Sequence, residues 1–178
     1  MCWGSNNAGE LGLGDVRYRT VPSRVGTRSG WARVSAGGPN GDYTCAIRTN
    51  NTLWCWGVNF AGQLGLGDTR TRFVPHEVGT RSGWAQVSAG GDHTCAIRTN
   101  NTLWCWGGNF VGELGLGDTT DRFAPRRVGT RRGWDHVATG ETHTCGVRTN
   151  NTLWCWGNNG IGQLGLGDFK YRLLPRKV

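Results

Sequence analysis

Apolar residues occur along this chain in short runs, and no segment shows the 3.6-residue periodicity of an amphipathic helix. Within one stretch, four such runs lie at residues 84–90, 93–99, 102–107 and 122–128, separated by polar or glycine-rich segments. Each has the length and the β-branched or aromatic content of a strand. Pro125 places the last run at a sheet edge, because proline cannot donate a ladder hydrogen bond. The pattern predicts an all-β fold of short antiparallel strands.

The second and third predicted strands form a hairpin whose register follows from its cysteines. Cys95 and Cys105 lie symmetrically about Asn100, which fits a three-residue loop that ends with Asn101 in the left-handed region. The two cysteines then face each other on one side of the hairpin, and small residues face tryptophans on the other. Since both faces are apolar, we expect the hairpin to be buried between two neighbouring sheets.

The whole pattern repeats with a period near 50 residues, which is typical of a β-propeller blade. We expect residues 1–178 to form a single propeller segment, with full four-stranded blades at 31–78, 84–128 and 134–178. Residues 2–25 would be a partial blade that contributes an edge strand. Because the last blade has its own edge strand, this tail cannot complete it. We therefore expect an open arc, a fragment whose remaining blades come from a longer chain or from another copy.

Composition narrows the functional classes. The chain holds 31 glycines, 10 tryptophans and a net charge of +8, with the basic residues spread through every repeat. This charge fits a plain solvated surface or a functional basic face, and it favours an acidic partner. No apolar stretch approaches the roughly 18 residues that a membrane span needs, so we expect no membrane partner.

Six of the seven cysteines form three equivalent pairs, and Cys2 is left over. Directly opposed strand residues lie within disulfide reach, so disulfides are predicted, and with them an extracellular or periplasmic location rather than a cytoplasmic or nuclear one. Buried free thiols that pack as small apolar groups are the alternative. Two cysteines across a hairpin supply only half of a zinc tetrahedron. The predicted disulfides are Cys45–Cys55, Cys95–Cys105 and Cys145–Cys155.

The stretch HTCAIRTNNTLWCWGGNFVGELGLGD, residues 93–118, resembles the regulator of chromosome condensation repeat family. The resemblance covers the whole chain and implies a seven-bladed β-propeller. The paired hairpin cysteines resemble the secreted bacterial branch of that family. The nuclear branch exchanges nucleotide on a small GTPase through an inserted wedge, and the one insertion here, at Pro39–Gly41, is too short to supply it.

Two further features, the LGLGD stretches and the histidines, could indicate a metal site or a catalytic site. The LGLGD stretches that end at Asp15, Asp68, Asp118 and Asp168 lack the nine-residue spacing of calcium-binding repeats. We expect each aspartate to accept backbone N–H bonds in a tight loop. His93 and His143 hold equivalent positions and are expected to tie a blade to a loop, whereas His76 and His136 are expected to be exposed. We predict no catalytic residue, metal or cofactor.

The residues that differ most among the copies follow each Gly-Asp pair. Arginine and aromatic residues, common there, are enriched in binding hot spots. We therefore expect a non-enzymatic scaffold for protein–protein binding, with an unknown partner and no nucleic acid. The alternatives are a nucleotide-exchange or chromatin-associated factor and an enzyme with a site in the propeller channel. The candidate binding residues are Arg17, Tyr18, Arg19, Arg70, Arg72, Phe73, His76, Arg122, Phe123, Arg126, Arg127, Lys170, Tyr171 and Arg172.

Overall fold

The computed structural model describes residues 1–27, 29–38 and 42–178, so the insertion at Pro39–Gly41 lies outside the described residues. The described chain consists of strands and loops, and it contains no helix that could cross a membrane. The strands are β1 (Cys2–Gly4), β2 (Arg19–Ser23), β3 (Trp31–Ala36), β4 (Tyr43–Arg48), β5 (Leu53–Gly57), β6 (Arg72–Glu77), β7 (Trp84–Ala89), β8 (His93–Arg98), β9 (Leu103–Gly107), β10 (Arg122–Arg127), β11 (Trp134–Thr139), β12 (His143–Arg148), β13 (Leu153–Gly157) and β14 (Arg172–Lys177).

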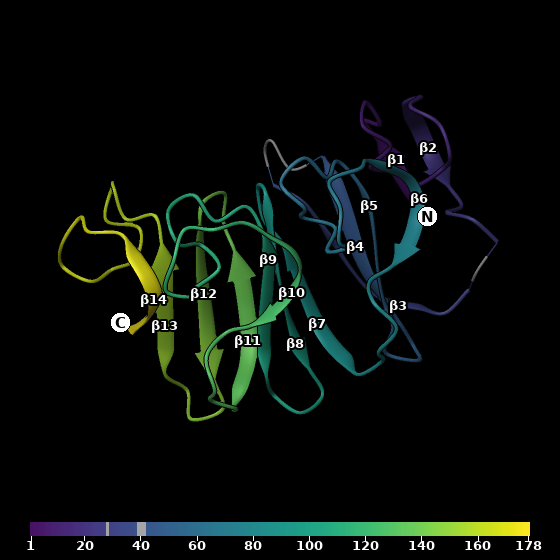
Figure 1. Cartoon of the computed structure of the whole chain (residues 1–178). Coiled ribbons are helices and arrows are strands. Elements are labelled where there is room, and N and C mark those ends of the chain that lie inside the picture. The colour runs from purple at the N-terminus through teal and green to yellow at the C-terminus, as the bar shows by residue number, and fades with distance from the viewer. Residues whose placement is uncertain (28, 39–41) are drawn as a thin grey trace.

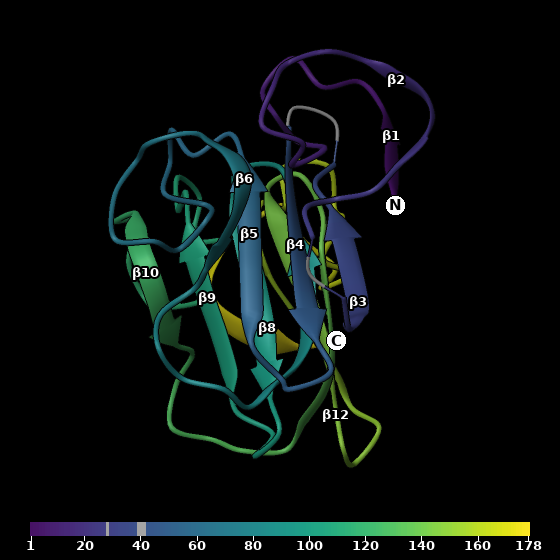
Figure 2. The same ribbon diagram turned by 90° about the vertical axis from the view of Figure 1, so that its right-hand side faces the viewer.

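The strands form three four-stranded antiparallel sheets, β3–β6, β7–β10 and β11–β14, and a two-stranded sheet of β1 and β2. In each large sheet the strands pair in chain order, as in a propeller blade. The sheets lie side by side in an open arc, with the two termini at opposite ends of it (Figure 1). Figure 2 shows the first sheet and the β1–β2 tail from the N-terminal side. The predicted all-β propeller architecture is confirmed.

The hairpins have the predicted register. In β8 and β9, Cys95 pairs with Cys105 and Ala96 pairs with Trp104. Asn101 has a φ of 60°, so the three-residue loop closes through the left-handed region as its sequence predicts. The edge strand β10, which contains Pro125, pairs with β9 only through an irregular register.

The cores lie between the sheets, because each hairpin presents apolar side chains on both faces. Ile47 and Leu53 of the first sheet pack in one cluster with Trp84 and Trp106 of the second. An equivalent cluster joins the second sheet to the third. Trp106 is completely buried, and burial of a large apolar side chain contributes roughly 1.5–3 kcal/mol. A single sheet cannot bury its own tryptophans, so the blades stabilise one another.

A repeated pair of hydrogen bonds fixes how each blade sits on the one before it. A threonine hydroxyl and a tryptophan indole of one blade both donate to a single backbone carbonyl in the preceding glycine-rich loop. For the second blade these donors are Thr94 Oγ1 and Trp106 Nε1, at 2.8 and 2.9 Å from the carbonyl oxygen of Gln63. The other two blades repeat this geometry with the carbonyl oxygens of Glu10 and Glu113.

The three cysteine pairs form disulfides: Cys45–Cys55, Cys95–Cys105 and Cys145–Cys155. Each joins directly opposed positions of one hairpin, with 4.1 Å between the Cα atoms. Cys2 is half-buried and is the free cysteine among the described residues.

Candidate protein-binding rim

Two loops of each repeat meet at the blade end opposite the hairpin tips. One is the turn that follows the third strand, residues 59–62 in the first blade, and the other follows the Gly-Asp pair, residues 68–72. Asn59 joins them, because its Nδ2 donates to the carbonyl oxygen of Asp68 at 2.9 Å and its Oδ1 accepts from Leu64 N at 2.9 Å. Asn59 is fully buried, and its counterparts Asn6, Asn109 and Asn159 repeat these bonds. The loop pair is therefore held in place from inside.

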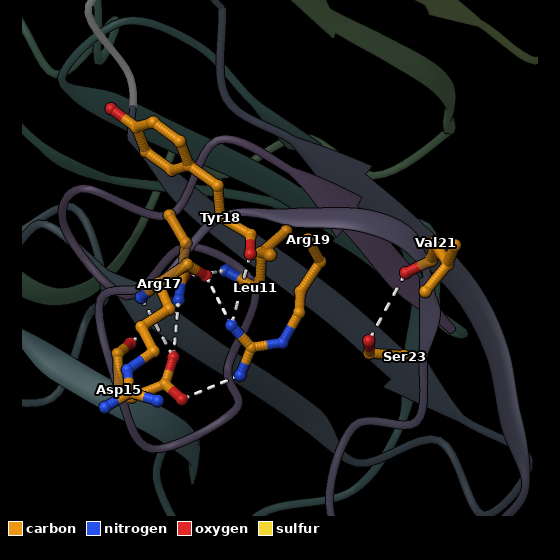
Figure 3. Close-up of polar contacts among 8 residues, drawn as sticks. Leu11, Asp15, Arg17, Tyr18, Arg19, Val21 and Ser23 are labelled. Carbon is orange, nitrogen blue, oxygen red and sulfur yellow. Dashed lines mark hydrogen bonds and ion pairs between the residues drawn. The ribbon is translucent and has the colours of Figure 1, made fainter.

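An ion pair closes the second loop of every repeat. The Arg19 guanidinium donates to Asp15 Oδ2 at 2.7 Å, and the backbone N–H of Arg17 donates to Asp15 Oδ1 at 3.0 Å (Figure 3). The hydrogen bond from Arg19 is the main cause that lowers the pKa of Asp15 below its ordinary value. Four of the predicted contact residues are thus engaged within their own loops: Arg19, Arg72, Arg122 and Arg172. Each aspartate accepts a backbone N–H bond as predicted.

Each repeat carries an exposed aromatic residue at one of two equivalent loop positions, and the last repeat carries a second exposed aromatic residue, Phe169, which is 71% exposed. Tyr18, Phe60, Phe110 and Tyr171 are 62%, 78%, 88% and 52% exposed. The phenylalanines belong to the first loop and the tyrosines to the second. Where the first loop has Phe60 or Phe110, the second has threonine or aspartate, and where the second has tyrosine, the first has asparagine or glycine. We call this set of four aromatic residues the aromatic rim.

Contacts between the loops show that the two aromatic positions are close neighbours. The Tyr18 hydroxyl donates to Asn7 Oδ1 at 2.7 Å, and Asn7 is the counterpart of Phe60. A Cβ atom built on Gly160 would lie 3.7 Å from the Tyr171 ring. In the second blade the backbone N–H of Asn109 donates to Asp121 Oδ1 at 2.9 Å, and Asp121 is the counterpart of Tyr18. In each repeat the aromatic residue therefore comes from one of two adjacent positions, one on each loop.

The remaining predicted contact residues are divided between the rim and the outer edge. Arg17, Arg70 and Lys170 are exposed on the second loops, next to the aromatic rim. Phe73 and Phe123 are 45% and 44% exposed and lean on the preceding repeat, where Gly9 and Gly62 leave room for them. His76, Arg126 and Arg127 lie farther along the edge strands β6 and β10.

The histidine side chains differ in their burial and in the hydrogen bonds that they make. His93 Nε2 lies 2.9 Å from Thr144 Oγ1 of the next blade, and burial lowers the pKa of His93 to about 3. His93 is therefore neutral, and it ties one blade to strand β12 of the next blade rather than to a loop. His136 is exposed as expected, but His76 is half-buried, and its Nδ1 lies 2.9 Å from the carbonyl oxygen of Val74. No group of three or more His, Cys, Asp or Glu side chains that could hold a metal ion occurs within the described ranges.

The sequence and the fold of this chain are similar to those of several known proteins. The chain is 36% identical over 81 residues to the ultraviolet-B receptor UVR8 of Arabidopsis thaliana. The aligned stretch covers 46% of this chain and 18% of that protein. It is 37% identical over 79 residues to the "Probable E3 ubiquitin-protein ligase HERC4" of Mus musculus, 43% of this chain and 7% of that protein. The crystal structure of Prp20p from Saccharomyces cerevisiae, described with its binding to Gsp1p and histones, matches with a TM-score of 0.85 at 20% identity. That match covers 99% of this chain and 45% of Prp20p, and at this identity it shows the fold alone.

The prediction of an extracellular or periplasmic location is wrong. The RCC1 and RCC2 proteins among the matched relatives are nuclear or cytoplasmic. The cysteine pairs were a poor guide because the hairpin register places them opposite each other whatever the compartment.

Sequence profiles of the repeat match this chain with the same period of about 50 residues, and the internal matches of the first profile run from one sheet into the next. The profile described as "Regulator of chromosome condensation (RCC1) repeat" matches residues 2–47, 50–97, 100–147 and 150–178. A second profile of the same repeat matches residues 32–63, 84–113 and 134–163. Since the first profile covers nearly all 178 residues, the chain belongs to the RCC1 repeat family.

Proposed function

We propose that this chain is a non-enzymatic RCC1-repeat scaffold that binds a protein partner through the aromatic rim. The observation that carries the proposal is that every repeat has an exposed aromatic residue at one of two neighbouring positions on its pair of loops. A ring exposed by 78% or 88%, as in Phe60 and Phe110, gains apolar contact area when a partner covers it. Aromatic side chains supply large contact areas at low cost in conformational entropy.

The residues next to the rim indicate what kind of partner fits it. Arg17, Arg70 and Lys170 occupy the same position on three of the four second loops, and all three are exposed. Aromatic rings beside basic groups favour a partner surface that combines apolar side chains with carboxylates. The blade bounds that go with this proposal are 31–78, 84–128 and 134–178, with the partial blade at 2–25.

The two alternative functions have weaker support. Prp20p, which binds Gsp1p and histones, shares the fold at 20% identity, so nucleotide exchange or chromatin association rests on fold similarity alone. The HERC4 relative is named as a ligase, but the chain spans 7% of its length. Both relatives have proteins as binding partners or substrates, which agrees with a protein-binding rim.

Site-specific photocrosslinking tests the proposal. A benzophenone amino acid replaces Phe60 or Phe110 in the rim, or Asn150 at an exposed hairpin tip as the control. We expect the same partner protein to crosslink from positions 60 and 110, and the crosslink to be lost when Tyr18 and Tyr171 become serine. Crosslinking from position 150 alone, or a crosslink that the tyrosine changes leave intact, would contradict the rim.

A further inference from the structure

A second surface lies at the opposite end of the blades, where the hairpin tips meet the linkers between blades. Gly83 N donates to the carbonyl oxygen of Asn51 at 3.0 Å, and Gly133 N does the same to Asn101, so each linker is held against the preceding tip. The linkers at 79–83 and 129–133 and the tips at 98–102 and 148–152 contain arginines and no acidic residue. Part of the chain's positive charge is therefore carried by these linkers and tips.

Two pockets open at this end, one in each of the last two blades, with volumes of about 280 and 470 Å³. The first is lined by Arg81, Trp84, Arg98, Trp104 and Pro125. The second has the same residue types at the equivalent positions and adds an arginine. We call them the tip pockets, and the second is lined by Arg131, Trp134, Arg148, Trp154, Pro175 and Arg176. The counterpart of Arg81 in the first blade, Arg28, lies outside the described residues.

Three arginines of the tip pockets lie over tryptophan rings, Arg98, Arg131 and Arg148, and none of the ion pairs among the described residues involves them. Arg98 and Arg148 also donate to the backbone carbonyl oxygens of Ser82 and Arg132. The Arg98 Cζ atom lies 4.9 Å from the centroid of the Trp84 ring and 5.8 Å from that of Trp104. Arg148 repeats this arrangement on Trp134 and Trp154, at 5.5 and 5.9 Å. The ion pairs found in the described part of the chain all lie in the second loops at the other end of the blades. Burial and repulsion from Arg81 lower the pKa of Arg98, as expected for two guanidinium groups that share a pocket without a counter-ion.

Each tip pocket also contains an indole N–H group that lacks an acceptor. Trp84 and Trp134 are each 4% exposed, and their Nε1 atoms are buried without a hydrogen-bond partner in the described ranges. Buried donors without an acceptor are rare in proteins, because each costs about 1–3 kcal/mol. By contrast, the half-buried Trp104 donates to Thr102 Oγ1 at 2.9 Å. Each pocket thus combines guanidinium groups and aromatic walls, and one of its tryptophans has a buried indole donor without an acceptor.

We propose that the tip pockets bind the carboxylate side chains of an acidic peptide segment, one glutamate or aspartate in each of the two blades. A guanidinium fork matches a carboxylate in shape and charge, and the tryptophans pack on the methylene groups of the same side chain. The two pockets have separate linings in successive blades, whereas a nucleic acid backbone needs a continuous basic track. This surface is independent of the aromatic rim and adds a second binding face to the scaffold.

Fluorescence anisotropy of a labelled octaglutamate peptide tests the proposal on the intact chain. Octaglutamine and an oligothymidylate eight nucleotides long serve as the uncharged and nucleic-acid probes. The variant R81Q/R131Q removes two exposed arginines from the tip pockets, and R17Q/R70Q removes the same charge from the rim end. We expect R81Q/R131Q to weaken octaglutamate binding about tenfold or more, and R17Q/R70Q to change it less than about threefold. In the wild-type chain, octaglutamate should also shift the Trp84 and Trp134 indole N–H resonances in an NMR titration.

Three results would overturn the tip pockets as carboxylate sites. Equal weakening by both variant pairs would show attraction to net charge alone. Tighter binding of oligothymidylate, lost in R81Q/R131Q, would show a nucleic-acid surface instead. Octaglutamate binding that moves neither indole resonance would place the peptide elsewhere. The double variant F60S/F110S should leave octaglutamate affinity unchanged, so failure of the aromatic rim and failure of the tip pockets are distinguished.

Discussion

The indole Nε1 of Trp106 donates to the carbonyl oxygen of Gln63 at 2.9 Å, and this hydrogen bond crosses from one blade to the preceding one. The same oxygen accepts from Thr94 Oγ1 at 2.8 Å, so both of its lone pairs are used. Because the geometry recurs at each junction between repeats, it sets the angle between blades. That angle in turn sets the positions of the aromatic rings along the rim.

Trp106→Phe should destabilise the fold by about 2 kcal/mol, from the lost hydrogen bond and the smaller side chain in a filled core. Urea unfolding measures the change. Trp3→Phe is the matched control, because Trp3 holds the equivalent position in the first repeat but is 60% exposed. We expect the control to change the free energy of unfolding by less than about 0.5 kcal/mol. Equal losses in both variants would show that the contact between blades does not account for the stability.

Gly65→Ala should be more damaging than Gly67→Ala, although both glycines lie in the same loop. Both have positive φ, +70° and +84°, so alanine is strained at either position by about 1 kcal/mol or more. At Gly65 the new Cβ would also lie 2.6 Å from Trp106 Nε1, whereas at Gly67 nothing lies within 4 Å. Thermal unfolding should show a loss for Gly65→Ala that exceeds that of Gly67→Ala by about 1–3 kcal/mol. A smaller or reversed difference would contradict the close approach of this loop to the indole.

Stability should fall in mild acid because of His93. Its folded pKa of about 3 is below the ordinary value of 6.5, so the unfolded chain binds the proton more readily. The contribution of His93 is therefore complete above pH 6.5 and is lost progressively as the pH falls toward 3. Between pH 7 and pH 5 the loss should be about 2 kcal/mol. Chemical unfolding at a series of pH values measures it.

His93→Tyr serves as the comparison, because the chain itself carries tyrosine at the equivalent position. The Tyr43 hydroxyl donates to the carbonyl oxygen of His93 at 2.7 Å. The variant should have a flatter stability profile between pH 7 and pH 5 than the wild-type chain. An unchanged slope would show that His93 is not the group responsible.

Each hairpin disulfide should contribute about 2–3 kcal/mol by closing a loop of about ten residues in the unfolded chain. Cys95→Ser/Cys105→Ser should lower the free energy of unfolding by that amount under non-reducing conditions. Cys2→Ser is the control, because Cys2 forms no disulfide. The intact mass before reduction should be about 6 Da below that after reduction, two hydrogens for each bridge. An unchanged mass would show three pairs of free thiols, the alternative that the sequence also allows.

The strands and hairpins could be predicted from sequence because they depend on local patterns. The symmetry of Cys95 and Cys105 about Asn100 sets the register, and asparagine at position 101 fits the left-handed turn. The rim was only partly predictable. Tyr18 and Tyr171 were identified as variable residues, but Phe60 and Phe110 lie in a stretch that resembles framework. Their equivalence depends on two irregular loops that meet in space, which strand periodicity does not report.

The arginines of the second loops are structural residues that the sequence analysis assigns to binding. Arg19 and its three counterparts were grouped with the variable binding residues because arginine is common at interfaces. They are, however, the same residue in all four copies, four positions after an aspartate. That invariance was the available signal of a structural ion pair, which the structure shows in every repeat.

Relocating one aromatic ring tests the proposed binding rim most directly. Phe110→Asn removes the ring of the second blade, and Phe110→Asn/Asp121→Tyr restores one from the other loop, which reproduces the Asn7 and Tyr18 pair of the first repeat. The dissociation constant for the protein crosslinked at position 110 is measured for both variants. We predict that the single change weakens binding about tenfold or more, and that the double change returns it to within about threefold of the wild type. Unchanged binding in Phe110→Asn, or a double variant as weak as the single one, would contradict the account.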